Sequence, residues 1–227
     1  MDVALIYILL DEAPSEVLKL KGELFKYLIK VRRHSLHDTI AFRCKENLEV
    51  LYSYEIIKID NRELELHQVR YEVKHVVAKK SLHVAWCVID IKSIEKVLAS
   101  LSEIGVSKIS FITCERSQSN FKTDFKRFSR ILEASMQQSG RSTYIEFDSY
   151  KSISSFVTVF PHVKVFDFTT KTLDDYADVS TVLIGCEGGF SKSERLFLND
   201  KDVFRLDSPM VLRSESAVVS VASKILL

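Results

Sequence analysis

The sequence predicts a two-part α/β protein, with a small β-rich domain at 1–70 followed by an α/β domain at 71–227. The first part consists of alternating or β-branched apolar runs separated by turn residues. The second consists of short continuous apolar segments that alternate with segments of helical periodicity, which predicts a mostly parallel sheet with helices on both faces. Hydrophobic residues make up 46% of the 227-residue chain, enough to bury a full core.

The N-terminal part is predicted to be a small barrel or curled sheet with one helix. The helix is expected at 22–33, where Leu24, Phe25, Leu28 and Val31 recur at helical spacing. Turn residues at 45–47 and 60–61 separate the later strands. The expected strands lie at 17–20, 39–44, 48–60 and 62–69.

The C-terminal part alternates strands and helices. Gly105 and Gly140 stand where two of the helices should end, and Ser191 with Glu194 predicts a capping box at the start of a third. The expected strands are 83–90, 108–114, 143–147, 163–168, 181–185 and 203–206. The expected helices are 93–104, 122–139, 191–199 and 214–227.

Composition narrows the possible classes of protein. With 32 basic and 31 acidic residues the net charge is +1, so any binding of nucleic acid must rely on local patches. The scattered cysteines (Cys44, Cys87, Cys114 and Cys186) and six histidines lack metal-ligand or disulfide spacing, which predicts free thiols and no metal. The sequence has no signal-peptide pattern and no apolar run of membrane-spanning length. We therefore expect a cytoplasmic protein.

Two polar loops follow strands near the C-terminus. One is the glycine loop Ile184-Gly185-Cys186-Glu187-Gly188-Gly189-Phe190-Ser191, and the other is Val211-Leu212-Arg213-Ser214-Glu215-Ser216-Ala217. Loops at the carboxyl ends of parallel strands are where such sheets bind small molecules. Taken alone, the glycine loop is equally well explained as a tight strand-to-helix turn. Arg213 and Glu215 taken alone are better explained as a surface ion pair, but the presence of both loops in one domain weakens that explanation.

Basic residues gather in three places. The densest cluster is either a solvated face or a phosphate-binding patch, and it comprises Lys30, Arg32, Arg33, His34 and His37. Arg116 follows the 108–114 strand and Arg141 follows the 122–139 helix. Arg116 is either solvated or a phosphate contact, and Arg141 is either a partner of the helix dipole or an RNA contact.

The ordered motifs resemble those of the RsmE methyltransferases, a family of the SPOUT superfamily. Segment 184–194 resembles the family's Ile-Gly-Pro-Glu-Gly-Gly-Phe/Leu-Ser-x-x-Glu, with Cys186 in place of proline. Segment 210–217 resembles Arg-Ile-Leu-Arg-Thr-Glu-Thr-Ala, with Met210 in place of the first arginine. Weaker matches stand at 27–33, 103–106, 115–117 and 137–141.

The resemblance implies a trefoil-knotted C-terminal domain that dimerises, a PUA-like RNA-binding N-terminal domain, and S-adenosylmethionine as cofactor. The implied reaction is methylation of N3 of a uridine in 16S ribosomal RNA of the small subunit, with Arg213 and Glu215 as catalytic residues. The implied RNA contacts are Lys30, Arg32, Arg33, Arg116 and Arg141. The implied cofactor contacts are Phe166, Ile184, Gly185, Glu187, Gly188, Gly189, Leu206, Val211, Leu212 and Ala217.

Two other functions remain open at this point. One is a methyltransferase of the same superfamily that acts on another RNA position, such as a ribose 2′-hydroxyl. The other is a non-catalytic RNA-binding factor of ribosome assembly, which is motivated by Met210 and by the absence of a Leu-Gly pair before it.

Overall fold

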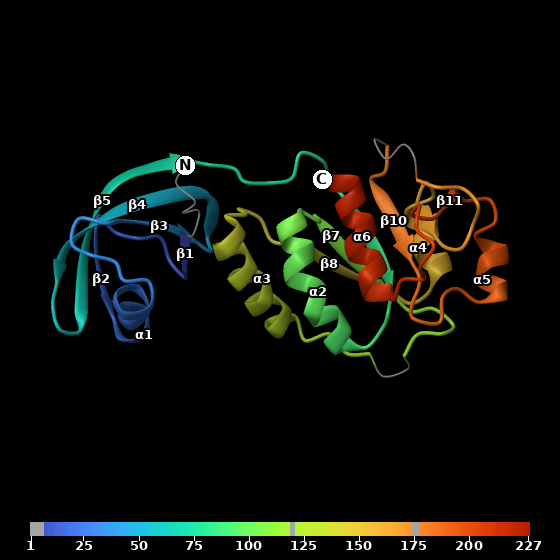
Figure 1. Ribbon diagram of the computed structural model, residues 1–227, viewed down its shortest axis with the longest axis horizontal. Helices are drawn as coiled ribbons and strands as arrows, with labels where there is room; N and C mark the ends of the chain where they lie inside the picture. Colours follow the sequence, from blue (N-terminus) through green and yellow to red (C-terminus); the bar gives the residue numbers. More distant parts are fainter. Residues whose placement is uncertain (1–6, 119–120, 174–177) are drawn as a thin grey trace. The chain divides into compact units, whose positions relative to one another are not determined.

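A computed structural model describes residues 7–118, 121–173 and 178–227, which form two compact units. One unit comprises Met1–Val77 together with Met136–Thr143, and the other comprises Ala78–Ser135 together with Tyr144–Leu227. Figure 1 shows both units and labels elements in each of them where there is room. The functional division into an RNA-binding part at 1–70 and a methyltransferase part at 71–227 stays a prediction.

The N-terminal unit is built on a five-stranded sheet in the order β1-β3-β4-β5-β2. Strand β1 pairs parallel with β3, and the other neighbours are antiparallel. Register shifts in the β4–β5 ladder bend these two long strands, which curve around α1 in Figure 1. The predicted curled sheet is therefore present. Its strands are Tyr7–Leu10 (β1), Val17–Lys21 (β2), Thr39–Cys44 (β3), Asn47–Ile59 (β4) and Glu63–Val73 (β5).

The expected helix at 22–33 is present as two pieces. An α-helix covers Gly22–Lys26 (α1), and a π-helical turn covers Tyr27–Val31 (η1). Phe25 and Leu28 are buried in the core of the curled sheet. The segment ends where Arg33 takes a left-handed conformation with φ of 59°. Strand β1 has only four residues, too few to show an alternating pattern in the sequence.

The C-terminal unit contains a six-stranded sheet in the order β11-β9-β10-β6-β7-β8. Every neighbouring pair is parallel, as the continuous apolar segments predict. The strands are His83–Cys87 (β6), Lys108–Ile112 (β7), Glu146–Tyr150 (β8), Lys164–Phe166 (β9), Thr181–Ile184 (β10) and Val203–Phe204 (β11).

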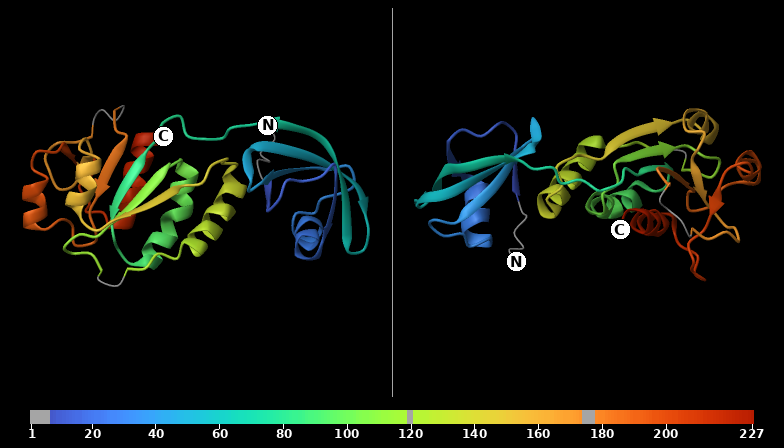
Figure 2. Two further views of the ribbon diagram at one scale, coloured as in Figure 1. Left: turned by 180° about the vertical axis from the view of Figure 1, so that it is seen from behind. Right: turned by 90° about the horizontal axis from the view of Figure 1, so that it is seen from above.

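Helices cover both faces of this sheet. On β6, successive side chains point to opposite faces: the His83 ring packs on Phe156 of α4 (Ile153–Val159), whereas Trp86 bonds Ser214 at the start of α6 (Ser214–Leu226). Helix α2 (Ile91–Ile104) lies beside α6 in Figures 1 and 2. The remaining helices are α3 (Phe125–Ser139) and α5 (Lys192–Phe197).

Local signals account for most helix ends. Ser191 and Glu194 form the predicted capping box of α5, and Gly105 ends α2 in the left-handed conformation. Helix α4 was missed in the sequence, although Ile153, Phe156 and Val157 recur at helical spacing in its short serine-rich segment; Ser152 caps it. Strand β8 begins at Glu146 rather than at 143, in register with Lys108 of β7.

Across the described ranges, no helix combines the length and the hydrophobicity that crossing a bilayer requires.

Because His83 is buried, the stability of the protein should depend on pH. The His83 Nε2 atom lies 2.7 Å from Ser110 Oγ, and burial, with a smaller effect of Lys108, lowers the pKa of His83 from 6.5 to about 4. Between these two values the unfolded chain takes up a proton that the folded protein does not, so stability falls as the pH falls. We expect a loss on the order of 3 kcal/mol between pH 7 and pH 4, measured by urea unfolding.

The variant His83→Gln should show a flatter dependence on pH over this range. The exposed His162 offers a matched control, since His162→Gln should keep the wild-type slope. Equal slopes in the two variants would contradict this assignment.

Candidate functional site

A cavity of about 260 Å³ lies at the carboxyl ends of β9, β10 and β11, beside the beginning of α6. This is the edge of a parallel sheet where loops converge and small molecules bind. Three loops and the first turn of α6 form its walls. The lining residues are Phe166, Asp167, Phe168, Ile184, Gly185, Cys186, Glu187, Gly189, Phe190, Arg205, Leu206, Ser208, Pro209, Met210, Val211, Leu212, Ser214 and Ala217.

The structure brings the predicted cofactor contacts together around this cavity, with the exception of Gly188. A Cβ atom at Gly188 would lie 3.2 Å from Cδ of Arg116, so this glycine makes room for a neighbouring side chain. Sequence reasoning missed other lining residues, among them Asp167 and Arg205. Both residues come directly after a strand, β9 or β11, and that position could have indicated them as lining residues.

The Ser214 hydroxyl ties three parts of the site together. It accepts a hydrogen bond from the Trp86 indole Nε1 over 2.8 Å and donates one to the Gly185 carbonyl over 2.6 Å. Trp86 is fully buried and Ser214 is 5% exposed, so water does not replace these bonds. The hydroxyl therefore fixes the start of α6 against β6 and against the glycine loop.

The glycine loop closes on itself through two contacts. The Gly189 amide donates to the Cys186 carbonyl over 2.9 Å, and the Cys186 thiol donates to the Gly189 carbonyl over 3.6 Å. Gly189 has φ of +63°, a conformation that side chains disfavour. The turn is thus held by hydrogen bonds at the position where the family carries proline.

A second set of contacts holds the glycine loop from the side of β7. The Arg116 Nη1 atom donates to the Gly188 carbonyl over 2.6 Å, and the Glu115 amide donates to Glu194 Oε1 over 2.8 Å. The other carboxylate oxygen of Glu194 accepts from the Ser191 amide over 2.8 Å. Arg116 is exposed, but one of its nitrogens is already engaged by the glycine loop. Its role as a phosphate contact stays a prediction.

Arg213 and Glu215 lie at the beginning of α6, on either side of Ser214, and neither lines the cavity. The Arg213 side chain is exposed. The Glu215 Oε2 atom is buried and has no hydrogen-bond partner among the described residues. Within those residues no ion pair joins Glu215 to Arg213, so the Glu215 Oε2 atom remains able to accept a hydrogen bond or a proton.

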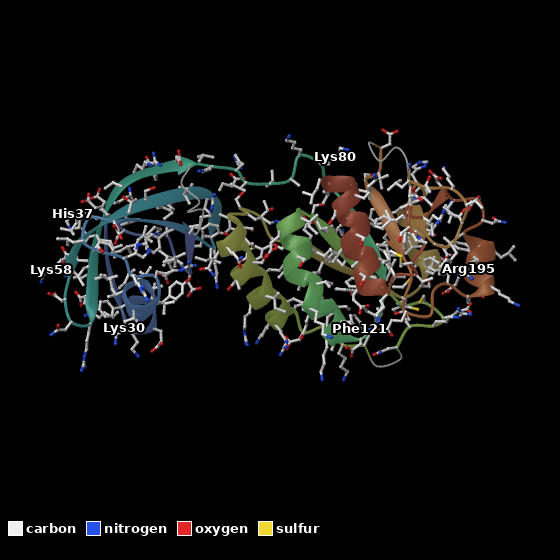
Figure 3. All side chains as sticks on the ribbon, viewed as in Figure 1. Lys30, His37, Lys58, Lys80, Phe121 and Arg195 are labelled. Atoms are coloured by element: carbon white, nitrogen blue, oxygen red, sulfur yellow. The ribbon has the colours of Figure 1, made fainter. Side chains whose placement is uncertain are left out.

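The cavity carries two carboxylates in its wall. Asp167 accepts from Arg195 Nε over 2.6 Å and from Arg195 Nη2 over 3.0 Å; Figure 3 labels Arg195 at α5. Glu187 is exposed on the glycine loop. Because Arg195 pairs with Asp167 and Arg205 also lines the cavity, Glu187 is the carboxylate of the wall that is left to face a positively charged ligand.

In the N-terminal unit, Lys30, Arg32 and Arg33 lie exposed on and just after η1, and Figure 3 labels Lys30 there. The Arg32 Nε atom donates to the Tyr27 hydroxyl over 2.8 Å. Arg141 differs, because it is 6% exposed and its Nε donates to the Thr143 carbonyl over 2.7 Å. Burial lowers the pKa of Arg141 to about 10. Its predicted contact with RNA would require this buried side chain to reach a phosphate.

Among the described residues, no group of three or more histidine, cysteine, aspartate or glutamate side chains is arranged to hold a metal ion.

The comparisons with known proteins agree with this geometry. Residues 77–226 match the RNA methyltransferase domain family, so the C-terminal unit defines the chain as a member of that class. The chain is 38% identical over 217 residues to ribosomal RNA small subunit methyltransferase E of Helicobacter pylori, covering 93% of this chain and 95% of that protein. The protein belongs to the ribosomal RNA small subunit methyltransferase E family.

Solved structures show the same fold over almost the whole chain. Ribosomal RNA small subunit methyltransferase E from Neisseria gonorrhoeae has a TM-score of 0.74 at 16% identity, covering 97% of this chain and 96% of that one. The putative methyltransferase Lpg2936 from Legionella pneumophila also has a TM-score of 0.74, at 21% identity, covering 97% of this chain and 95% of that one.

Removal of the Ser214 hydroxyl should destabilise the protein. In Ser214→Ala the Trp86 indole N–H stays buried without an acceptor, which costs about 1–3 kcal/mol in free energy of unfolding. Urea unfolding followed by Trp86 fluorescence measures this loss. Ser216→Ala is the matched control, because Ser216 is exposed on the same helix, and it should change stability by less than about 0.5 kcal/mol. Equal effects of the two substitutions would contradict the stabilising role assigned to the hydrogen bonds of the Ser214 hydroxyl.

Proposed function

We propose that this protein transfers a methyl group from S-adenosylmethionine to N3 of a uridine in 16S ribosomal RNA of the small subunit. The observation that carries the proposal is the cavity in which the glycine loop and the 205–212 loop meet the start of α6. The Helicobacter pylori relative is named as a methyltransferase of small-subunit ribosomal RNA. The Neisseria and Legionella proteins of the same fold were solved with S-adenosylmethionine bound.

The residues of the cavity fit this cofactor. Ile184, Leu212 and Ala217 provide apolar surface for an adenine ring, and the glycine loop lets a ligand approach the backbone closely. Glu187 would face a positive group of the cofactor, whereas Asp167 is paired with Arg195. When bound, S-adenosylmethionine supplies an electrophilic methyl group on a sulfonium centre.

The residues at the start of α6 would act on the uridine. N3 of a free uridine carries a proton at neutral pH, so this proton must leave when the methyl group is transferred. Arg213 would stabilise the resulting negative charge through a carbonyl oxygen of the base, a role that its exposed position at the start of α6 supports. The unpartnered Oε2 of Glu215 supports this carboxylate as the proton acceptor rather than only as a partner of Arg213.

Replacement of Arg213 should therefore separate binding from chemistry. With small subunits that lack the modification, the wild-type protein should incorporate labelled methyl groups at uridine N3, mapped by mass spectrometry. Arg213→Ala should reduce this rate at least 100-fold and leave the cofactor Kd, measured by calorimetry, within about threefold of wild type.

Lys192→Ala is the control, because it removes an exposed cation from nearby α5. A normal rate in Arg213→Ala would remove the role assigned to this arginine. Methylation of a ribose 2′-hydroxyl would instead support the alternative target, and failure to bind cofactor would support a non-catalytic assembly factor.

For the N-terminal unit we propose a PUA-like RNA-binding module. The curled five-stranded sheet with its single helical segment supports this assignment. The exposed cluster of Lys30, Arg32 and Arg33 supplies the positive charge that phosphates require.

Charge reversal in this cluster should weaken RNA binding in a way that depends on salt. In Arg32→Glu/Arg33→Glu we expect at least a tenfold loss of affinity at low salt, and a slope of log K against log salt reduced by about 1–2. Fluorescence anisotropy with a labelled RNA fragment measures both. Lys58→Glu/Arg62→Glu makes the same change in net charge at the β4–β5 turn and should have little effect. Equal losses in both double variants would point to net charge rather than to a specific patch.

The finer assembly of the protein is also part of the proposal. We infer a trefoil knot in the C-terminal unit, supported by the 205–212 segment, which leaves β11 and leads into α6 beside the glycine loop. A homodimer is supported by the exposed apolar side chains Phe168, Met210 and Val211 at the cavity. A cytoplasmic location follows from ribosomal RNA as the substrate.

A further inference from the structure

Another cavity, of about 590 Å³, lies within the N-terminal unit, where strands β1, β3, β4 and β5 and the turn η1 contribute to its wall. None of the aspartates and glutamates that the structure describes lines it. The arginine and lysine side chains that line it are Arg32, Arg43, Arg70 and Lys74. The cavity is therefore a strongly positive feature in a chain whose net charge is only +1.

Part of the cavity wall is one face of the curled sheet. Tyr7, Ala41, Ser53 and Arg70 form a row across four strands, because each is paired in register with the next. Side chains in such a row point to the same face, which is opposite to the face of the neighbouring core residue Ile40. Ala41 and Ser53 are small, so they leave space between the larger side chains of the row.

Arg43 is the buried member of the group. It is 1% exposed, and its Cζ atom lies 5.1 Å from the centre of the Tyr7 ring. Its Nη2 atom donates to the Lys74 carbonyl over 2.9 Å, and its Nη1 atom donates to the Leu48 carbonyl. The Nε atom is buried and has no hydrogen-bond partner in the part of the chain that the structure describes. The guanidinium is thus held in place with donor capacity left over.

The positive charge of Arg43 is not balanced by an ion pair within the described ranges. Glu72 acts on it only from a distance, because this carboxylate is paired with Arg70, with Oε1 and Nη2 3.9 Å apart. Burial lowers the pKa of Arg43, and Tyr7 and Glu72 offset only part of this effect. A buried cation without an anion is costly for folding. An anion that enters the cavity would supply the missing charge.

The other cations connect Arg43 with the surface. Arg32 and Arg70 are exposed, and Lys74 is half-buried. The bond of Arg32 to the Tyr27 hydroxyl holds both side chains at the cavity, since both line it. Arg32 also belongs to the exposed basic cluster proposed above to meet RNA. The cavity is therefore continuous with that surface.

We propose that this cavity binds a phosphate group of the RNA, with Arg43 as its buried anchor and Arg70 and Lys74 as further donors. The proposal rests on the RNA-binding role proposed for the N-terminal unit, and it adds an enclosed site to the exposed cluster. A guanidinium matches a phosphate in geometry, and a lysine adds a point charge. Because phosphate contacts do not depend on base sequence, the site would fix the position of the RNA rather than select its sequence.

The first test measures RNA binding by variants of the full chain at the cavity. In Arg70→Gln/Lys74→Gln we expect about a tenfold loss of affinity for a labelled oligouridylate at low salt, measured by fluorescence anisotropy. The slope of log K against log salt should fall by about 1, as for the loss of one phosphate contact. Lys58→Gln/Arg62→Gln is the matched control, because it removes the same charge at the β4–β5 turn and should change both quantities little.

The second test asks whether a phosphate reaches the buried end of the cavity. The side-chain Nε–H resonance of Arg43, assigned by nuclear magnetic resonance in the wild-type protein, should shift downfield when the oligouridylate is added. An excess of inorganic phosphate should shift it in the same direction. The measurement leaves Arg43 intact, so it does not depend on whether a variant at this buried position folds.

Three results would overturn the proposal. The first is an equal loss of affinity in the two double variants, which would point to net charge. The second is an Arg43 resonance that the oligouridylate does not move. The third is a resonance that moves with inorganic phosphate while Arg70→Gln/Lys74→Gln binds the oligouridylate like wild type, which would make the cavity a site for a free anion. The proposed function fails separately, if the protein transfers no methyl group to small subunits.

Discussion

The hydrogen bonds of the buried Ser214 hydroxyl set the geometry on which the site depends. This oxygen accepts a hydrogen bond from the Trp86 indole and donates one to the Gly185 carbonyl, so its position is fixed by two groups. Trp86 is anchored in the sheet, so the position of β6 determines where α6 begins. Arg213 and Glu215 flank Ser214, and their placement follows from the same two bonds. A residue that contributes no chemistry thereby positions the two that we assign to catalysis.

The glycine loop is held from the opposite side by the segment after β7. Arg116 bonds the Gly188 carbonyl, and Glu194 joins the Glu115 amide to the capping box of α5. A loop held at both ends gives up little conformational freedom when a ligand binds, so more of the contact energy appears as affinity. The rigidity comes from hydrogen bonds contributed by distant parts of the chain, which allows the loop itself to be rich in glycine.

Local sequence signals predicted much of the fold. The continuous apolar run of β6 indicated a buried parallel strand, and Ser191 with Glu194 indicated the start of α5. The strand order could not be predicted, because it depends on long-range packing rather than on periodicity. The gathering of the glycine loop and the Arg213 loop was expected from the resemblance to a family, whereas the bonds of Ser214 and Arg116 to that loop were not. Arg141 shows the same limit, since no local pattern indicates that a helix-end arginine is buried.

Cys186 holds the glycine loop in shape at the position where the family motif carries proline. In the family motif a proline stiffens this position, and its ring offers neither a donor nor a reactive atom. Here the thiol closes the turn by donating to the Gly189 carbonyl, so the loop keeps its shape without proline. The substitution therefore preserves the geometry of the loop through a hydrogen bond of the side chain rather than through a ring.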